Sequence, residues 1–209
     1  MAQFKTALEA SSYQHPGHCS PYEHHRKQTM EKMLELGCEY ATMAEHALSW
    51  AEDQDPFGHV MSQAYPHINA KCFTRLLESF EESLKDKFPD FMGARGISAM
   101  TNRYTMAVKR VVKYPDTVIT GARISEVRPD RVFVIFSVWS VRQNIMVAEF
   151  QAWVVFFNHD KGVTVELPRE GGVYNELYRN LLRRAEESNR AVQRWHMKKI
   201  AGSPAQEKL

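Results

Sequence analysis

The feature that most constrains the fold of this chain is a set of four long segments that favour β-strands. Each is rich in Val, Ile, Phe, Thr, Tyr and Trp, residues that pack well on a pleated sheet. The segments span residues 97–112, 117–126, 131–141 and 145–158. Short turn sequences separate them, namely Tyr114-Pro115-Asp116, Arg128-Pro129-Asp130 and Arg142-Gln143-Asn144. Because connections this short join antiparallel neighbours, the sequence predicts one antiparallel sheet.

Two of these segments are apolar on both faces. They contain Val-Phe-Val-Ile-Phe at residues 132–136 and Trp-Val-Val-Phe-Phe at residues 153–157. Strands that are covered on both sides have this pattern. We therefore expect these two strands to be central in the sheet.

A helical pattern precedes the strands, at about residues 62–87. Its apolar residues form two neighbouring lines, made of Ile68, Cys72, Leu76 and Phe80 and of Phe73, Leu77 and Leu84. Such a wide stripe predicts a largely buried helix. Pro66 fits only its first turn, and Phe88-Pro89 is expected to end it. A sheet that curves around one buried helix satisfies both apolar surfaces, which predicts an α+β fold.

Further helices are expected at both ends of the chain. Residues 22–44 predict an amphipathic helix interrupted near Gly37, and residues 46–50 a short strand. Residues 173–200 predict a long helix, with Leu177, Leu181, Ala185 and Val192 inward and Arg183, Arg184 and Arg190 on a solvated face. Residues 1–20 are polar and predict a tail. We expect terminal extensions at residues 1–45 and 171–209 around a central domain at residues 46–170.

Composition excludes several functional classes. The 209 residues are 44% hydrophobic, which suffices for one domain with a real core. A net charge of +2 with dispersed Lys and Arg gives no reason to expect a nucleic-acid partner. No apolar run approaches the ~20 residues that span a bilayer. We expect an intracellular protein, in the cytoplasm or in an organelle such as a mitochondrion or a peroxisome; the final Lys208-Leu209 matches only part of a peroxisomal signal.

No metal, cofactor or disulfide framework is expected. Cys19, Cys38 and Cys72 are an odd number of cysteines without C-x-x-C spacing, which favours a reducing compartment. His15, His18 and Cys19, followed by His24-His25, invite a metal site. They lie in a polar segment without a matching set of ligands, so tail composition is the favoured interpretation.

The loop before the buried helix carries a distinctive run, Asp53-Gln-Asp-Pro-Phe-Gly-His-Val60. It resembles the signature D-x-D-x-x-G-H-V-N-N-x-x-Y of hot-dog-fold thioesterases of the 4-hydroxybenzoyl-CoA thioesterase and acyl-CoA thioester hydrolase type. The matching residues are Asp53, Asp55, Gly58, His59, Val60 and Tyr65. Residues 104–118 resemble a later stretch of that family, in which Asp116 keeps the position of an aspartate and Pro115 replaces a glycine. The resemblance covers about residues 46–168 and implies the hot-dog fold, a long helix wrapped by a curved antiparallel sheet.

The resemblance also implies a chemistry, the hydrolysis of an acyl thioester carried by coenzyme A or an acyl-carrier protein. Asp55 would attack the carbonyl carbon or activate a water molecule. His59 would position the loop or bind the substrate, and Gly58 would let the backbone approach it. Amides at the helix N-terminus would stabilise the oxyanion. The remaining substrate-binding residues would be Val60, Met61, Ser62 and Tyr65.

The sequence departs from the family pattern in three places. Met61 and Ser62 replace the two asparagines, and Trp50-Ala51 stand where a basic residue is usual. Lys71 or its neighbours occupy the position at which some branches of the family keep a helix glutamate. The substrate, and the retention of catalysis, therefore stay open.

Two alternatives follow within the same fold. One is a non-catalytic scaffold or assembly subunit, which suits the Met61-Ser62 change and the terminal extensions. The other, a dehydratase or hydratase, would need a G-D-x-N-P-x-H run, and neither its spacing nor its asparagine is found. The G-x-S-x-G elbow, G-x-G-x-x-G and the P-loop are absent.

An exposed sheet edge would favour association of copies. We expect a homodimer, or a dimer of dimers, because pairing removes unpaired backbone groups from solvent. The strands at residues 131–141 and 145–157 are the candidates for the joint.

Overall fold

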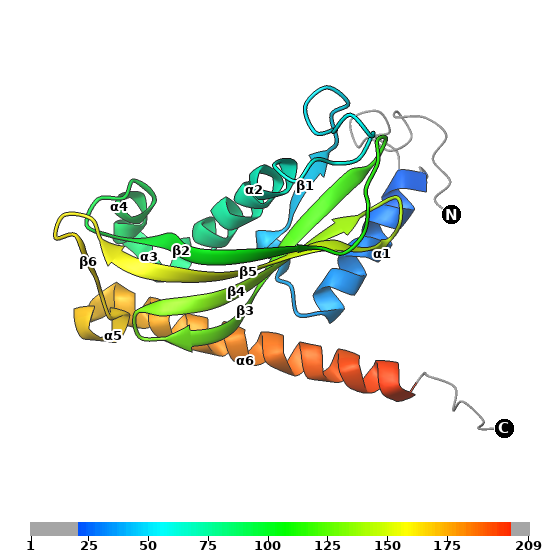
Figure 1. The fold of residues 1–209 in the computed structure, drawn as a ribbon. Coiled ribbons are helices and arrows are strands. Elements are labelled where there is room, and N and C mark those ends of the chain that lie inside the picture. Colours follow the sequence, from blue (N-terminus) through cyan, green and yellow to red (C-terminus); the bar gives the residue numbers. More distant parts are fainter. Residues whose placement is uncertain (1–20, 202–209) are drawn as a thin grey trace.

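The fold is a curled antiparallel sheet with helices on both of its faces, seen in a computed structural model that describes residues 21–201 (Figure 1). The strand order is β1-β3-β4-β5-β2, and β6 pairs with β5. The strands are β1 (Ala44–Ala47), β2 (Ile97–Val108), β3 (Thr117–Arg128), β4 (Arg131–Ser140), β5 (Ile145–Asn158) and β6 (Val163–Thr164). The four segments with strand character are thus β2 to β5, and the two that are apolar on both faces, β4 and β5, are central.

The positions of β4 and β5 contradict the expectation that these strands join two copies. β4 pairs with β3 and β5, and β5 pairs with β4 and β2. Both therefore use their hydrogen-bonding groups on both sides, and the prediction that either one joins two copies is wrong. β2 is a free edge of the sheet, because it pairs only with β5 along its 12 residues, and β1 is the terminal strand on the other side.

The buried helix is α2 (Ala64–Glu78), which lies across one face of the sheet (Figure 1). Ala64, Tyr65, Ile68, Cys72 and Leu76 are its buried residues, as the four-residue spacing predicts. Pro66 lies in the first turn, as expected. Phe136 of β4 packs edge-on against Phe73 of α2, with ring centroids 6.3 Å apart.

The expected end of this helix at residue 87 is wrong. After Glu78 the chain breaks into α3 (Glu81–Leu84), a 3-10 turn (Lys85–Lys87) and α4 (Phe88–Met92). Phe80 and Leu84 are 1% and 0% exposed, so apolar spacing continues through the break and conceals it. Pro89 lies in the first turn of α4 instead of ending a helix, because a proline needs no hydrogen-bond partner there.

The terminal helices are α1 (Pro21–Glu35) and α6 (Gly172–Ala201), and the short α5 (Leu167–Glu170) precedes α6. The expected break near Gly37 follows α1, where Gly37 has φ +81°. A Cβ at this position would lie 2.7 Å from the Ser188 carbonyl oxygen of α6. Glycine is therefore required both by the left-handed conformation and by the close approach of α6.

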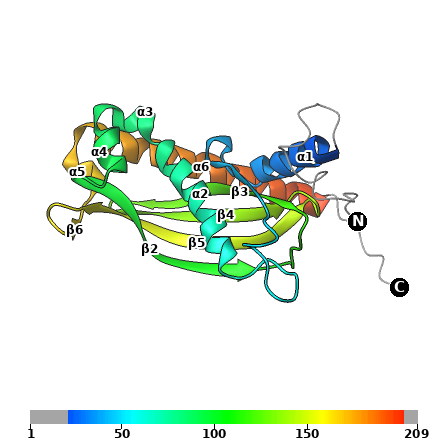
Figure 2. The same cartoon turned by 90° about the horizontal axis from the view of Figure 1, so that it is seen from above.

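α6 runs along the β3 side of the sheet, opposite the free edge β2 (Figure 2). β1 pairs only with Thr117–Thr120, which leaves the rest of β3 without a strand neighbour on that side. There the Asn189 side-chain amide donates to the Ser125 carbonyl at 2.9 Å, and the Glu39 amide donates to the Ala122 carbonyl at 2.9 Å. These groups satisfy an edge that would otherwise be open to pairing.

α6 also contributes to the main hydrophobic core. Leu177 and Leu181 are fully buried, and Ala185 is 7% exposed, in the cluster that contains Ile68 and Phe136. On the other face, Met33 of α1 packs over Gly121 of β3. The domain limits at residues 46 and 170 stay a prediction.

The described residues hold no helix long and apolar enough to cross a bilayer. Between residues 21 and 201 no group of three or more His, Cys, Asp or Glu side chains could hold a metal ion. His24 and His25 lie in α1, whereas His15, His18 and Cys19 lie outside the described residues, as do Lys208 and Leu209.

Candidate functional site

The loop between β1 and α2 is closed on itself by backbone hydrogen bonds. Gln54 and Val60 form an antiparallel bridge. The Asp55 amide donates to the His59 carbonyl at 2.8 Å, and the Gly58 amide donates to the Asp55 carbonyl at 3.0 Å. Gly58 has φ +74°, and a Cβ there would meet nothing within 4 Å. The turn conformation, and not a close approach, therefore accounts for this glycine in the isolated chain.

Asp55 uses one carboxylate oxygen to hold this turn and leaves the other available. Its Oδ1 accepts hydrogen bonds from the Phe57 and His59 amides, both at 2.9 Å. Its Oδ2 lies 3.9 Å from His59 Nδ1, and no hydrogen bond to Oδ2 is found within the described part of the chain. The Asp55 side chain is 28% exposed and that of His59 is 38% exposed. An accessible, oriented carboxylate oxygen suits a nucleophile or a general base.

Asp53 occupies a different environment, although it lies only two residues away. It is 5% exposed, its Oδ2 accepts from the Ser49 amide at 2.7 Å, and His46 Nε2 lies 2.9 Å from the same oxygen. His46 Nδ1 lies 2.7 Å from Lys71 Nζ. Because an ammonium can only donate, Nδ1 accepts and the Nε2–H group donates to Asp53. Asp53 therefore anchors the loop to β1 and α2.

The other residues of the signature fall into two groups. Val60 and Tyr65 belong to the core, with 8% and 2% exposure. Met61 and Ser62 lie immediately before α2, and the Met61 amide donates to the Asp53 carbonyl at 2.8 Å. No side chain caps this end of α2, since Gln63 at the N-cap makes no such bond. The Ala64 amide donates to the Met61 carbonyl at 3.0 Å and Pro66 has no amide hydrogen, so the Tyr65 amide is the first-turn donor that no cap occupies among the described residues.

Asp116 is a buried carboxylate just before β3 that binds the end of β4 and the turn after it. It accepts hydrogen bonds from Ser140 Oγ at 2.5 Å, from its neighbour's amide (Thr117) at 2.7 Å and from the Arg142 amide at 3.0 Å. Burial raises its pKa to about 6, although these three donors and the Arg142 charge act in the opposite direction. Burial and the nearby Asp116 charge also raise the pKa of Tyr65 to about 12.

An apolar pocket of about 180 Å³ lies between the first half of α2 and the sheet. Phe73 of α2, Tyr104 of β2, Phe136 of β4 and Phe150 of β5 contribute to its walls. Asn69 also lines it, and its buried Oδ1 has no hydrogen-bond partner among residues 21–201. The sequence analysis missed this pocket, because its walls come from four elements that converge only in the folded sheet.

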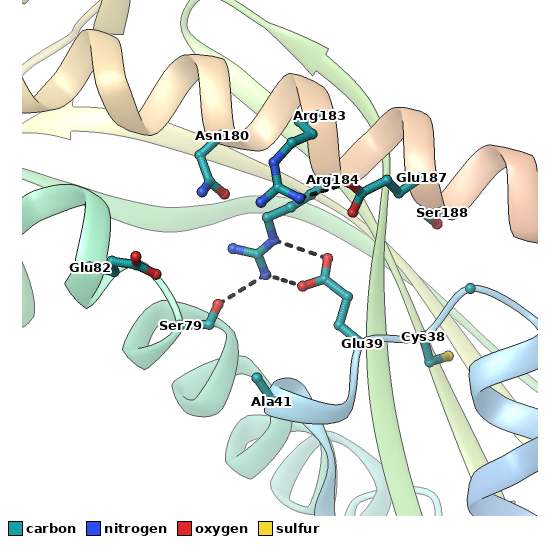
Figure 3. A pocket seen from close by; sticks show the side chains of 11 residues that line it. Cys38, Glu39, Ala41, Ser79, Glu82, Asn180, Arg183, Arg184, Glu187 and Ser188 are labelled. Carbon is teal, nitrogen blue, oxygen red and sulfur yellow. Dashed lines mark hydrogen bonds and ion pairs between the residues drawn. The ribbon is translucent and has the colours of Figure 1, made fainter.

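A second hollow, of about 360 Å³, lies where α6 meets the end of α2 (Figure 3). Its central side chain, Arg184, is 7% exposed and forms a two-pronged ion pair with Glu39, at 3.0 and 2.6 Å. Arg184 also donates to Ser79 Oγ at 2.9 Å and lies over the Phe80 ring. Through these bonds the Arg184 guanidinium holds α6 against Glu39 and Ser79, so its role is structural. The expected solvated face therefore holds for Arg183 and Arg190, but not for Arg184.

Comparisons with known proteins address the fold. No profile of a known protein family and no curated protein matches the sequence. Solved structures do match, among them a DHNA-CoA thioesterase from Staphylococcus aureus, with a TM-score of 0.54 and 15% identity over 67% of this chain and 89% of that one. A hypothetical protein from Staphylococcus aureus in complex with CoA has a TM-score of 0.55 and 11% identity, over 68% and 84% of the two chains. A 1,4-dihydroxy-2-naphthoyl-CoA thioesterase from Synechocystis has a TM-score of 0.52 and 14% identity, over 66% and 96%.

This chain has the hot-dog fold. The α+β architecture that the signature implied is confirmed, with a helix wrapped by a curved antiparallel sheet and with extra helices at both ends. At these low identities the likeness shows the hot-dog fold alone. The matched parts cover about two thirds of the chain.

Proposed function

We propose that this hot-dog protein is a thioesterase that hydrolyses an acyl thioester of coenzyme A or of an acyl-carrier protein. The observation that carries the proposal is the geometry of Asp55, whose Oδ1 is fixed by two backbone amides, whereas Oδ2 accepts no hydrogen bond among residues 21–201 and the side chain is 28% exposed. The proposal is supported by the names of the matched proteins, two of which are CoA thioesterases. No cofactor is needed for this chemistry.

The proposed reaction uses groups that surround the loop. Asp55 Oδ2 attacks the thioester carbonyl, or takes a proton from an attacking water molecule. The uncapped Tyr65 amide in the first turn of α2 donates to the oxyanion, where the helix dipole adds to its effect. The thiolate is a good leaving group, so a strong general acid is not required. The pocket beside Asn69 and Phe73 would receive part of the acyl group.

We further propose that two copies associate through β2. This edge strand is long and exposes Met100, Tyr104 and Val108, at 42%, 53% and 49%. A long apolar edge is a liability in a monomer, whereas pairing with a second β2 satisfies its backbone groups. Tyr104 also lines the apolar pocket, so a second copy at β2 would lie beside the proposed acyl site.

The test is release of free thiol from a panel of aliphatic and aromatic acyl-CoAs and acyl-carrier thioesters, measured with a thiol-reactive dye. Asp55→Asn should lower turnover by roughly 100- to 10,000-fold, because amidation removes the reactive oxygen but keeps the size of the side chain. Glu52→Gln is the matched control, since Glu52 is an exposed carboxylate of the same loop. His59→Ala should give an intermediate loss. Full activity of Asp55→Asn, at matched melting temperatures, would exclude this mechanism.

A non-catalytic scaffold is the second candidate, and the replacement of both family asparagines by Met61 and Ser62 favours it. It predicts a folded wild-type protein that turns over no thioester of the panel. Hydration of an enoyl thioester, which leaves the thioester bond intact, would instead support a hydratase.

A further inference from the structure

A third cavity, of about 450 Å³, lies on the face of the sheet opposite α2. Side chains alternate between the two faces of a strand, so Phe136 lines the pocket under α2 while its neighbours Ile135 and Ser137 line this cavity. The second half of α6 forms its roof with Val192 and Trp195. None of the residues that contribute to the thioesterase proposal lines this cavity, which makes the two sites separate.

The floor of the cavity contains Arg123, a cation without an ion pair in the described part of the chain. The structure shows no hydrogen bond or ion pair to its guanidinium within residues 21–201, although the Glu149 carboxylate attracts it from farther away. Glu149 is already bound to Lys109, whose Nζ lies 2.9 Å from its Oε2. Burial lowers the pKa of Arg123, yet a guanidinium stays protonated at neutral pH. With Lys109 and Glu149 cancelling, the cavity holds one uncompensated positive charge.

The remaining walls are mostly apolar. Trp139, Met146, Ile135 and Leu36 surround the floor, and Trp139 carries an indole N–H group that is buried without a hydrogen-bond partner among the described residues. A half-buried cation and an unused donor are costly to leave unpaired. The volume lies within the range of small-molecule sites, roughly 300–1,000 Å³. One positive charge in a mostly apolar cavity suits a ligand with one negative charge and one apolar chain.

We propose that this cavity binds an amphipathic monocarboxylate of the size of a medium-chain fatty acid. The carboxylate pairs with the planar guanidinium of Arg123, which offers two parallel donors, and the chain lies against Trp139, Met146 and the α6 roof. The inference does not rest on the proposed hydrolysis, because the cavity and the Asp55 loop lie on different elements.

The test uses the full chain and decanoate brominated at its last carbon, because bromine quenches tryptophan fluorescence on contact. Trp139 and Trp195 line the cavity and are two of the four tryptophans. We expect saturable quenching with one site per chain and competition by plain decanoate. Decanol, which lacks the charge, should compete about tenfold less well or worse.

Arg123→Gln should weaken binding by about tenfold or more, measured by calorimetry with decanoate. Arg128→Gln is the matched control, because Arg128 lies on the same strand, is paired with Glu126 and stacks on Trp153 outside the cavity. Val192→Phe narrows the cavity from the α6 side and should also weaken binding. An absence of saturable quenching, or equal affinity in wild type and folded Arg123→Gln, would overturn the proposal.

Discussion

At the scale of single residues, three aspartates of one region have three different environments. Asp55 is partly exposed and keeps one oxygen available, Asp53 is buried against His46, and Asp116 is buried among neutral donors. The spacing of the signature identifies the positions of Asp53 and Asp55, but it cannot show which one is solvent-accessible. That difference arises from the partners of the two side chains: Asp53 packs against His46 of β1, whereas Asp55 lies in the turn whose Phe57 and His59 amides it binds.

The buried aspartate of the signature should matter for stability more than for chemistry. Asp53→Asn should lower the free energy of unfolding by about 1–3 kcal/mol, because it disrupts a buried hydrogen-bonded pair with His46. Asp55→Asn should cost much less, since Oδ1 can still accept from both amides. Urea denaturation of the two variants measures the difference. A larger loss in Asp55→Asn than in Asp53→Asn would contradict the assignment of Asp53 as the anchor.

Asp116 should make stability depend on pH in a defined window. Its pKa rises from 3.8 in the unfolded chain to about 6 in the folded one, mainly through burial. Between these values the folded state binds more protons, so stability should fall as the pH rises from about 4 to about 6. At about 1.4 kcal/mol per pKa unit the whole effect is about 3 kcal/mol.

The variant Asp116→Asn lacks this titration. Its free energy of unfolding, measured by urea denaturation at intervals across the window, should fall less with pH than that of wild type. The slope is the readout, since the substitution also changes the absolute stability. Parallel curves for the two proteins would mean that Asp116 titrates with its ordinary pKa in the folded state.

At the scale of elements, the starts of the long strands were more predictable than the ends of the helices. Turn residues such as Pro129-Asp130 mark where strands stop, and the first residue of each long strand matches the expected position. The end of α2 has no such mark, because Phe80 and Leu84 continue the helical spacing into separate short helices. Periodicity reports which side chains are buried, and this pattern survives a break in the backbone.

Substitutions in α6 can test whether this helix is part of the folded core. Leu181 is fully buried in the main cluster, whereas its neighbour Leu182 is 42% exposed. Leu181→Ala should cost about 2–5 kcal/mol of unfolding free energy, as buried leucines do. Leu182→Ala should change it by about 0.5 kcal/mol or less. Equal effects would show that α6 is peripheral, as the domain limits at 46–170 suppose, and the fragment 44–170 would then fold without it.

At the scale of the whole molecule, the sequence indicated a single antiparallel sheet. The expectation that the short turn at residues 114–116 joins neighbouring strands is wrong, because β2 and β3 are separated by β4 and β5. The segment at residues 97–112 lacks the two-sided apolar pattern of the central strands, which is compatible with an edge strand but does not identify its neighbour in the sheet. Its place follows from the long connection through residues 109–116, which carries the chain from β2 to β3 across the sheet. The apolar pocket and the cavity under α6 depend on this order, and for that reason neither could be predicted.

The free edge of β2 leads to a prediction about the oligomeric state. If two copies pair through it, light scattering at micromolar concentration should give twice the mass of one chain. The double variant Met100→Lys/Val108→Lys should shift the protein toward monomer, because the two-fold symmetry of a dimer brings both pairs of new charges to one interface. Met197→Lys is the matched control, since Met197 is a 63% exposed methionine of α6, on the opposite side of the sheet. A monomeric wild type would contradict the dimer, and with it the placement of an acyl site between two copies. A dimer that persists in the double variant, but not in a variant of α6, would move the interface to the other edge.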